Sequence, residues 1–509
     1  MKIPQEILEI IKSLQKKGFE AYLIGGCVRD LLLNKKPKDW DITTNALPHE
    51  IQSVFKDSLY ENQFGTVAVK TNSEDETLKI VEITTFRKEG KYTDKRHPDL
   101  ITFAKTLKED LSRRDFTINA MAIEIRITNQ ELRIKKNTKT VIHDSKFMIP
   151  VIIDPFNGQK DLKDKLIKAV GNPNERFQED ALRLIRAIRF ACELNFEIEK
   201  ETFNALKKNS YLIRYIAKER IKDEFIKIIQ TENAKKGILL LKETDLLKEI
   251  IPELEETVGV SQNKHHLYPV FEHLINSLDY AAKKNYSLEV RLASLFHDIG
   301  KPKTKKGEGK DATFYNHEIV STKITQKILK RLKFPNEILN KVLKLVRYHG
   351  FVYEPQVTTD SSVRRLLLKV SKENIQELAQ VREADRIGSG CPKAVPFRLR
   401  HFLFRVEKIL KETSGEQPSL KMLKVNGNDV LRILNIPPGP KVGMILNILL
   451  EKVIDNPSLN QKETLEKEIK KLKKLSIKEL EKLNEKAKEK YKNLLEEEER
   501  KIKQKYQVA

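Results

Sequence analysis

Two aspartates, Asp39 and Asp41, stand two residues apart in KDWDIT (38–43), whose alternation predicts a β-strand. Side chains at that spacing point to the same face of a strand. Because adjacent carboxylates repel each other, the pair favours a bound cation, and Mg²⁺ prefers such hard oxygen ligands. A third carboxylate, Glu82, stands in the apolar segment IVEITTF, where an acidic residue is expected to be buried for a specific purpose. Three carboxylates on neighbouring strands favour two-metal phosphoryl or nucleotidyl transfer.

A glycine pair, Gly25 and Gly26, separates a short apolar strand predicted over 21–26 from a helix predicted over 28–33. Glycines at such a junction let backbone N–H groups approach a phosphate at the positive end of the helix. Arg29, one turn into the helix, could add a charge-assisted contact. This junction is therefore a candidate phosphate-binding site.

Four charged residues follow a helical period in EDALRLIRAIRFA: Asp180, Arg183, Arg186 and Arg189. On a helix, Asp180 and Arg183 share a face. The carboxylate can accept from a base amino group and the guanidinium can donate to ring acceptors, so together they offer a base-pairing edge made of protein. An ordinary helical ion pair explains the same spacing, and the spacing alone leaves both interpretations open. Arg186 and Arg189 continue this face and are placed to reach a phosphate.

The elements that must position these residues change character along the chain. The first 125 residues mix a predicted helix with strands, whereas beyond residue 160 the apolar residues keep a helical period. The last fifty residues are rich in Lys, Glu and Leu and keep an approximate seven-residue apolar rhythm, which predicts a long helix or a helical hairpin. The pattern predicts a mixed α+β region followed by helices.

Length and composition limit the alternatives. A chain of 509 residues allows three or four domains, and no apolar stretch is long enough to span a bilayer. The N-terminus mixes charge into its apolar positions, unlike a signal peptide, and three scattered cysteines do not form a disulfide framework, so we expect a cytoplasmic protein without membrane partners. The net charge of +23 favours a polyanion such as nucleic acid, although a lysine-rich genome would produce a similar excess.

Several motifs occur in a fixed order: GGCVRDLLL, KDWDIT, FGTV, VEITTFR, YTDKRHP and EDLSRRDFTINAMA, followed by DPFNGQKDL and EDALRLIRAIRFA. Together they resemble the class II tRNA nucleotidyltransferase and bacterial poly(A) polymerase family, within the polymerase-β-like nucleotidyltransferase superfamily. The resemblance implies an α+β polymerase-β-like nucleotidyltransferase head followed by an all-α neck, an HD-type body and a helical tail. The implied boundaries are 1–150 for the catalytic head, 151–255 for the neck that selects bases and binds RNA, 256–400 for the HD-type metal-binding domain and 401–509 for the helical RNA-binding body and tail.

In the head, the resemblance implies that Asp39 and Asp41 bind two catalytic Mg²⁺ ions. Glu82 would complete this site as a metal ligand or as the general base for the primer hydroxyl. Gly26 and Arg29 would contact the phosphates of the incoming nucleotide. Segment 89–100 resembles the family's flexible loop, which helps the enzyme switch from adding C to adding A.

Two further arginine-containing motifs acquire roles by the same resemblance. Arg114, in RRD, would hold a phosphate or the ribose of the nucleotide. Asp180 and Arg183 would read C or A directly, without a nucleic-acid template. The segment 123–152 is longer than in relatives and is expected to form an extra β-hairpin or a loop.

Six residues downstream stand in contexts that resemble an HD domain, a helical metal-dependent phosphohydrolase fold: His273, His297, Asp298, His317, His349 and Asp385. Imidazoles and carboxylates from successive helices can hold one or two divalent ions. The resemblance implies that His273, His297, Asp298 and Asp385 bind an additional divalent metal. His317 and His349 would complete a second site or contact phosphate. A 2′,3′-cyclic phosphodiesterase or phosphatase activity remains open.

The implied reaction is attack by an RNA 3′-hydroxyl on the α-phosphate of CTP or ATP, with release of pyrophosphate. FGTVAV and the RHP loop favour complete CCA addition to tRNA 3′ ends over an A-adding enzyme or a poly(A) polymerase. From other classes, an HD-domain metal-dependent phosphohydrolase and a non-catalytic RNA-binding protein are the alternatives. The intact carboxylate set argues against both.

Overall fold

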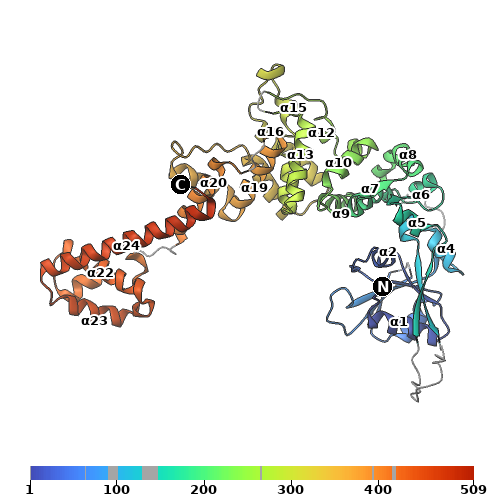
Figure 1. Cartoon of the computed structure of the whole chain (residues 1–509), viewed down its shortest axis with the longest axis horizontal. Helices are drawn as coiled ribbons and strands as arrows, with labels where there is room; N and C mark the ends of the chain where they lie inside the picture. Colours follow the sequence, from blue (N-terminus) through green and yellow to red (C-terminus); the bar gives the residue numbers. More distant parts are fainter. Residues whose placement is uncertain are drawn as a thin grey trace, which may run out of the picture. The chain divides into compact units, whose positions relative to one another are not determined.

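The structure is a computed structural model of the chain, and it describes residues 2–62, 65–89, 101–128, 147–263, 266–391, 395–414 and 420–508 (Figure 1). The chain forms two compact units, Met1–Arg347 with Ile387–Gly390, and Tyr348–Arg386 with Cys391–Ala509. Among the described helices, none has the length and apolar character needed to cross a membrane.

A seven-stranded mixed sheet organises the N-terminal region, in the order β3-β4-β5-β2-β1-β8-β9. The strands are β1 (Ala21–Ile24), β2 (Asp41–Thr44), β3 (Ser58–Asn62), β4 (Thr66–Lys70), β5 (Ile80–Thr85), β8 (Ala122–Thr128) and β9 (Phe147–Ile153). All neighbouring pairs are antiparallel except β2 and β5, which are parallel. The expected α+β head is confirmed.

One face of this sheet is buried against three helices, α1 (Gln5–Lys16), α2 (Gly26–Leu32) and α3 (Pro48–Val54). Helix α1 contributes Ile7, Ile11 and Leu14 to the core, as its helical apolar spacing requires. Trp40 is 3% exposed and belongs to the same core. Because Ile42 on β2 also points into this core, the neighbouring Asp41 is directed toward the opposite face of the sheet.

The hairpin at one end of the sheet corresponds to the long segment 123–152. Strands β8 and β9 pair antiparallel from Ala122↔Ile153 to Thr128↔Phe147. The hairpin prediction is therefore confirmed for its two arms. The connection 129–146 lies outside the described residues, as do residues 90–100 of the segment predicted to be a flexible loop.

Helices follow the sheet within the first unit (Figure 1). They include α2 (Gly26–Leu32), which lies between β1 and β2, and then α4 (Leu107–Ser112), α5 (Gly158–Lys163), α6 (Pro173–Glu179), α7 (Leu182–Leu194), α8 (Lys200–Asn209), α9 (Lys218–Ile229), α10 (Ala234–Glu243), α11 (Leu246–Ile250), α12 (Pro252–Glu255), α13 (Val270–Lys283), α14 (Leu288–Phe296), α15 (Lys301–Thr304), α16 (His317–Arg331) and α17 (Asn336–Tyr348). Most of α7 is buried, and it packs against α9 and α10. This burial fixes the charged side chains of α7 relative to the sheet.

The second unit is helical and has its own core. Its helices are α18 (Asp360–Val370), α19 (Ile375–Gly388, whose last two residues belong to the first unit), α20 (Phe397–Ser414), α21 (Gly427–Leu434), α22 (Pro440–Asp455), α23 (Lys462–Leu472) and α24 (Ile477–Tyr506). The apolar residues Leu465, Ile469, Leu472 and Leu480 are buried against α21 and α22. The seven-residue rhythm therefore produces a helical hairpin, α23 and α24, that packs into a globular core.

Candidate active site

The three predicted carboxylates lie at the junction of β2 and β5. In the parallel register of these strands, Asp41 is directly opposite Glu82, so both side chains project from the same face. Asp39 does not lie on the strand, and this part of the prediction is wrong: β2 begins at Asp41. The reason is that β1 ends at Ile24, where the chain turns at Gly25, so residues before Asp41 have no β1 partner.

The expected burial of Glu82 is also wrong, because its side chain is exposed. The face of β5 that carries it opens to solvent, whereas its neighbours Val81 and Ile83 point into the core on the other side. Glu82 is thus accessible to a substrate beside Asp41. This placement suits a ligand or a proton acceptor better than a buried position would.

The electrostatics of Asp41 fit a bound divalent cation. Burial raises the pKa of Asp41 to about 6; the Arg114 guanidinium opposes this rise, while the charges of Asp39 and Glu82 add to it. A carboxylate that is costly to ionise beside two others is stabilised by a cation. The charges of Asp39 and Glu82 thus lie close enough to Asp41 to raise its pKa.

Gly25 and Arg114 are packed against each other beside this carboxylate. Gly25 has a φ of 77°, in the left-handed region, and a Cβ at this position would lie 2.7 Å from Arg114 Nη1 and 3.5 Å from Asp41 Oδ2. Only glycine allows this backbone conformation and close approach together. Arg114 Nε is buried and has no hydrogen-bond partner within the described parts of the chain, although its Nη1 donates to the carbonyl of Asn119 at 3.4 Å. This unsatisfied donor is suited to a phosphate oxygen.

Arg29 lies on α2 as predicted, one turn after the glycine pair. Its guanidinium donates to Asp30 Oδ1 at 2.9 Å and to Asn119 Oδ1 at 2.8 Å. These contacts fix its orientation beside Gly26, whose Cβ would lie 3.6 Å from Arg29 Nη2. The predicted contact between Gly26, Arg29 and a phosphate is geometrically possible.

Three guanidinium groups surround the ring of Phe190. Arg29 and Arg186 each lie 5.3 Å from the ring centroid, and Arg189 lies 4.1 Å from it. Asp115 accepts from Arg186 at 2.6 Å, and Glu224 pairs with Arg189 Nε at 2.8 Å. Phe190 and the two acids hold the arginines in place against their mutual repulsion.

Asp39, Asp41 and these arginines line one cleft of about 860 Å³, whereas Glu82 is not among its lining residues. Lysines at its rim make basic side chains more numerous than acidic ones, among them Lys35, Lys36, Lys38 and Lys227. A cleft of this size is large enough for a nucleoside triphosphate. The excess of positive charge favours a polyphosphate.

The prediction that Asp180 and Arg183 share a helix is wrong. Helix α6 ends at Glu179 and α7 begins at Leu182, so Asp180 lies between them. Its carboxylate accepts from the N–H of Leu182 at 3.0 Å, which caps the new helix instead of continuing the old one. Arg183 is buried and donates to Glu179 Oε2 at 2.8 Å and to the carbonyl of Arg113 at 2.9 Å. The two side chains are thus oriented by different partners.

Sequence reasoning missed the acidic partners that hold the site together. Asp110 is fully buried and accepts from Arg113 at 2.9 Å and from the N–H of Arg87 at 3.2 Å. Asp115 is held by Arg186, and this contact keeps the pKa of Asp115 near 2 against the effect of burial. The motif RRDFTIN could have indicated these partners, because charged residues flank Arg114 on both sides of it.

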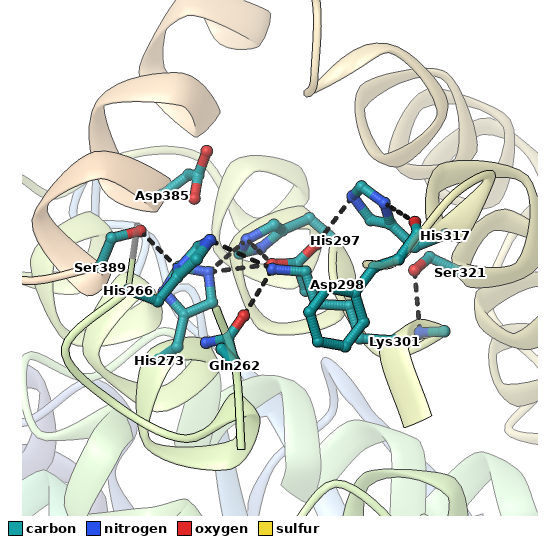
Figure 2. A network of polar contacts seen from close by, with 12 residues as sticks. Gln262, His266, His273, His297, Asp298, Lys301, His317, Ser321, Asp385 and Ser389 are labelled. Atoms are coloured by element: carbon teal, nitrogen blue, oxygen red, sulfur yellow. Dashed lines mark hydrogen bonds and ion pairs between the residues drawn. The ribbon is translucent and has the colours of Figure 1, made fainter. Parts of the chain in front are cut away.

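The predicted histidine cluster is present in the first unit, and Figure 2 shows its contacts. His273, on α13, and His297, at the end of α14, are fully buried, with their Nε2 atoms 2.9 Å apart. Asp298 Oδ2 lies 3.2 Å from the first Nε2 and 3.4 Å from the second. An ion at roughly 2.1 Å from each of three ligands would produce separations close to these. These three residues therefore fit a divalent metal.

Another predicted ligand, His317, lies beside the same aspartate. His317 Nε2 lies 3.2 Å from the second carboxylate oxygen of Asp298, and its Nδ1 faces the Phe314 carbonyl at 2.8 Å. His349 and Asp385 belong to the second unit and are both buried there. Gly388, three residues after Asp385 on α19, packs so closely on α13 that a Cβ would lie 2.7 Å from the His273 carbonyl.

A lysine that sequence reasoning did not single out lies within the cluster. Lys301 is 4% exposed, and its Nζ lies 2.6 Å from Asp298 Oδ2, close to Gln262 Oε1 and 3.3 Å from His266 Nε2 (Figure 2). Together with His297 it holds the pKa of Asp298 well below its usual value, although burial acts in the opposite direction. Its ammonium neutralises the charge of this carboxylate.

Lys301→Met is expected to lower the free energy of unfolding by about 3 kcal/mol in the presence of a chelator, because Asp298 loses its closest cation while remaining buried. Added Mn²⁺ should restore more stability to this variant than to the unchanged protein. Denaturant unfolding with and without Mn²⁺ measures both effects. The control is Lys303→Met, since Lys303 lies 3.5 Å from Glu256 and both side chains are about half exposed. Equal stability of Lys301→Met and the unchanged protein in chelator would contradict this role.

The mixed sheet carries neighbouring carboxylates beside a basic cleft, and the helices that follow supply further arginines. These features together define a nucleotidyltransferase. Three family models match the chain: "Poly A polymerase head domain" over residues 21–168, "Probable RNA and SrmB- binding site of polymerase A" over 195–257 and "HD domain" over 270–389.

Relatives cover nearly the whole chain. The CCA-adding enzyme of Ligilactobacillus salivarius is 32% identical over 476 residues, which are 92% of this chain and 98% of the relative. The CCA-adding enzyme of Listeria monocytogenes is 42% identical over 236 residues, 46% of this chain and 53% of the relative. The crystal structure of the Bacillus stearothermophilus CCA-adding enzyme in complex with CTP is 27% identical with a TM-score of 0.56, covering 92% of this chain and 98% of that one. The chain belongs to the family of CCA-adding enzymes.

Proposed function

We propose that this protein is a template-independent nucleotidyltransferase that adds CCA to tRNA 3′ ends, with CTP and ATP as donors. The observation that carries this proposal is the register of β2 and β5, which places Asp41 opposite Glu82 beside the cleft that Arg114 lines. The relatives named CCA-adding enzymes, one of them solved in complex with CTP, support the choice of reaction.

Asp39 and Asp41 would hold Mg²⁺, which when bound would neutralise the triphosphate and favour ionisation of the attacking hydroxyl. The proposal of Mg²⁺ rests on the hard oxygen ligands that these residues offer. Gly25 and Gly26 allow the triphosphate to approach the start of α2, where backbone N–H groups face it.

The remaining residues bind the nucleotide and accept the proton. Arg29 and Arg114 would bind the phosphates, and Arg186 and Arg189 extend the same positive surface. The RNA 3′-oxygen attacks the α-phosphorus, the bond from this phosphorus to the bridging oxygen breaks, and pyrophosphate leaves. Glu82, exposed beside Asp41, is placed to accept the hydroxyl proton.

One assay separates the possible products. Purified protein is incubated with tRNA ending at the discriminator base, at CC or at CCA, with CTP and ATP supplied separately and together, and the 3′ ends are sequenced. We expect two C residues and then one A on the shortest tRNA, and no extension of the complete one. Addition of A alone, or of a long A tract, would replace CCA addition by one of the related reactions.

We propose that Asp180 and Arg183 set nucleotide choice, with Arg183 held rigidly by Glu179 and Asp180 placed at the start of α7. Asp180→Ala is expected to change the ratio of CTP to ATP incorporation by about tenfold, which is the effect of losing one base-reading hydrogen-bond pair. The maximal rate should fall less. Single-nucleotide incorporation with each substrate measures this ratio, and Glu201→Ala, an exposed acid of α8, is the control. An unchanged ratio would contradict the proposal.

A second activity is suggested by the histidine cluster, whose ligand atoms have the spacing of a metal site. We propose hydrolysis of a 2′,3′-cyclic phosphate as its candidate reaction. Asp298→Asn should remove this hydrolysis and leave nucleotide transfer intact. Hydrolysis that persists in the variant would exclude the cluster as its source.

The division into head, neck, HD-type domain and helical tail, with the boundaries given by the sequence, is part of this proposal. So is the location in the cytoplasm. The family models support the first three parts in the same order.

A further inference from the structure

The second unit contains a pocket that the proposed reaction does not use. It has a volume of about 490 Å³ and is lined by the loop 351–354, the last turns of α19 and the first turns of α20. We propose that this pocket binds one unstacked nucleotide, with the base against an aromatic wall and the phosphate on arginines. The volume lies within the range of small-molecule sites.

The wall of the pocket is a cluster of aromatic rings. Phe351 and Phe402 have centroids 4.7 Å apart, and Tyr353 packs on Phe402 at 5.3 Å. Phe402 and Tyr353 are buried, and the Tyr353 hydroxyl is hydrogen-bonded to His401 Nδ1 at 2.7 Å, so this wall is held in place. Phe397, at the rim, is 46% exposed. The exposed ring of Phe397, beside this fixed cluster, suits stacking of a planar base.

Three arginines complete the pocket: Arg382, Arg386 and Arg398. Arg382 pairs with Asp385 at 2.7 Å, and Arg398 pairs with Glu354, the only acidic residue of the lining. Arg386 Nη2 donates to Cys391 Sγ at 3.1 Å, whereas its Nε is buried with no hydrogen-bond partner within the described chain. The lining therefore has excess positive charge.

The combination of features selects the ligand. An apolar pocket for a lipid or an apolar helix would not need three guanidinium groups, and an acidic peptide would not need an exposed aromatic ring. A nucleotide uses both, because aromatic side chains stack on bases and arginine binds phosphate in a fork geometry. The source of this nucleotide rests on the proposed function. If the protein binds tRNA, the nucleotide belongs to an unpaired part of that RNA.

The test compares Phe397→Ala and Arg386→Gln with Leu368→Ala, a control whose side chain is 83% exposed on α18 and does not line the pocket. Binding of a tRNA transcript and of CMP and AMP is measured by fluorescence anisotropy or calorimetry at one fixed salt concentration. We expect each pocket variant to weaken tRNA binding by about tenfold, the effect of losing one stacked base. The control should bind as the unchanged protein does.

A crosslinking measurement keeps the test decisive if a variant folds poorly. The unchanged protein is irradiated with tRNA that carries 4-thiouridine, and we expect adducts on the loop 351–354 or on Phe397. Loss of CMP or AMP binding in the variants, with tRNA binding unchanged, would support the nucleotide pocket and assign it to free nucleotide. Unchanged binding of all three ligands, or adducts only elsewhere, would overturn the proposal.

A failure of the pocket proposal can be distinguished from a failure of the proposed function. If the unchanged protein adds CCA while the pocket variants bind every ligand normally, only this inference fails. If the unchanged protein transfers no nucleotide, the proposed function fails, and the binding results still decide whether the pocket takes a nucleotide.

Discussion

Asp41→Asn is expected to lower the rate of nucleotide addition by about 10³-fold or more while tRNA binding stays within about twofold. Asn has nearly the same shape as Asp but cannot supply the negative charge that a catalytic cation needs. The substitution also leaves Asp39 beside a neutral group instead of a carboxylate, so the pair offers less negative charge to a cation. Single-turnover addition of CMP and AMP to tRNA measures the rate, and a separate binding assay measures affinity for tRNA.

The matched control is Asp57→Asn, an exposed aspartate that precedes β3 in the same sheet. It should leave the rate unchanged, because its side chain does not line the cleft. A rate for Asp41→Asn within tenfold of the unchanged protein would mean that the carboxylates on β2 and β5 are not the catalytic group.

Gly25→Ala should lower kcat/KM for CTP and ATP by about 10²-fold, the effect of displacing one preorganised contact of the transition state. The added methyl group would lie 2.7 Å from Arg114 Nη1, so the guanidinium must move away from the carboxylates. The φ of 77° adds backbone strain of roughly 1–2 kcal/mol. Steady-state kinetics with each nucleotide measure the effect on activity.

The variant Gly18→Ala is the control that separates backbone strain from displacement of the Arg114 guanidinium. Gly18 also has a positive φ, of 86°, but nothing lies within 4 Å of its Cβ position. In denaturant unfolding, Gly18→Ala should lose only the stability that backbone strain costs, whereas Gly25→Ala should lose more because of the contact with Arg114. Only Gly25→Ala should lose activity. Equal activity of the two variants would show that the close packing on Arg114 has no part in transfer.

The sequence predicted the site best where local pattern determines structure. The glycine pair, the helix that follows it, and the strands carrying Asp41 and Glu82 follow from apolar spacing and from turn residues. The position of Asp39 was wrong because β2 begins at Asp41, and β1 ends before it could pair with Asp39. Asp180 was misplaced because its side chain caps a new helix, which periodicity does not distinguish from continuation.

Contacts between distant segments could not be predicted from spacing. Arg186 pairs with Asp115, 71 residues earlier, and Arg189 pairs with Glu224. Lys301 was overlooked because a lysine in a basic chain carries no signal until its burial is known. The family resemblance supplied candidate roles for the arginines, and the folded chain supplied their partners.

The parallel pairing of β2 with β5 has a consequence for synthesis on the ribosome. Because β3 and β4 intervene in sequence and β4 lies beside β5 in space, Glu82 reaches Asp41 only after the whole segment from 41 to 85 has left the exit tunnel and paired. Arg114 and α7 emerge later still. A nascent chain therefore lacks its complete set of carboxylates until β5 has emerged and paired with β2.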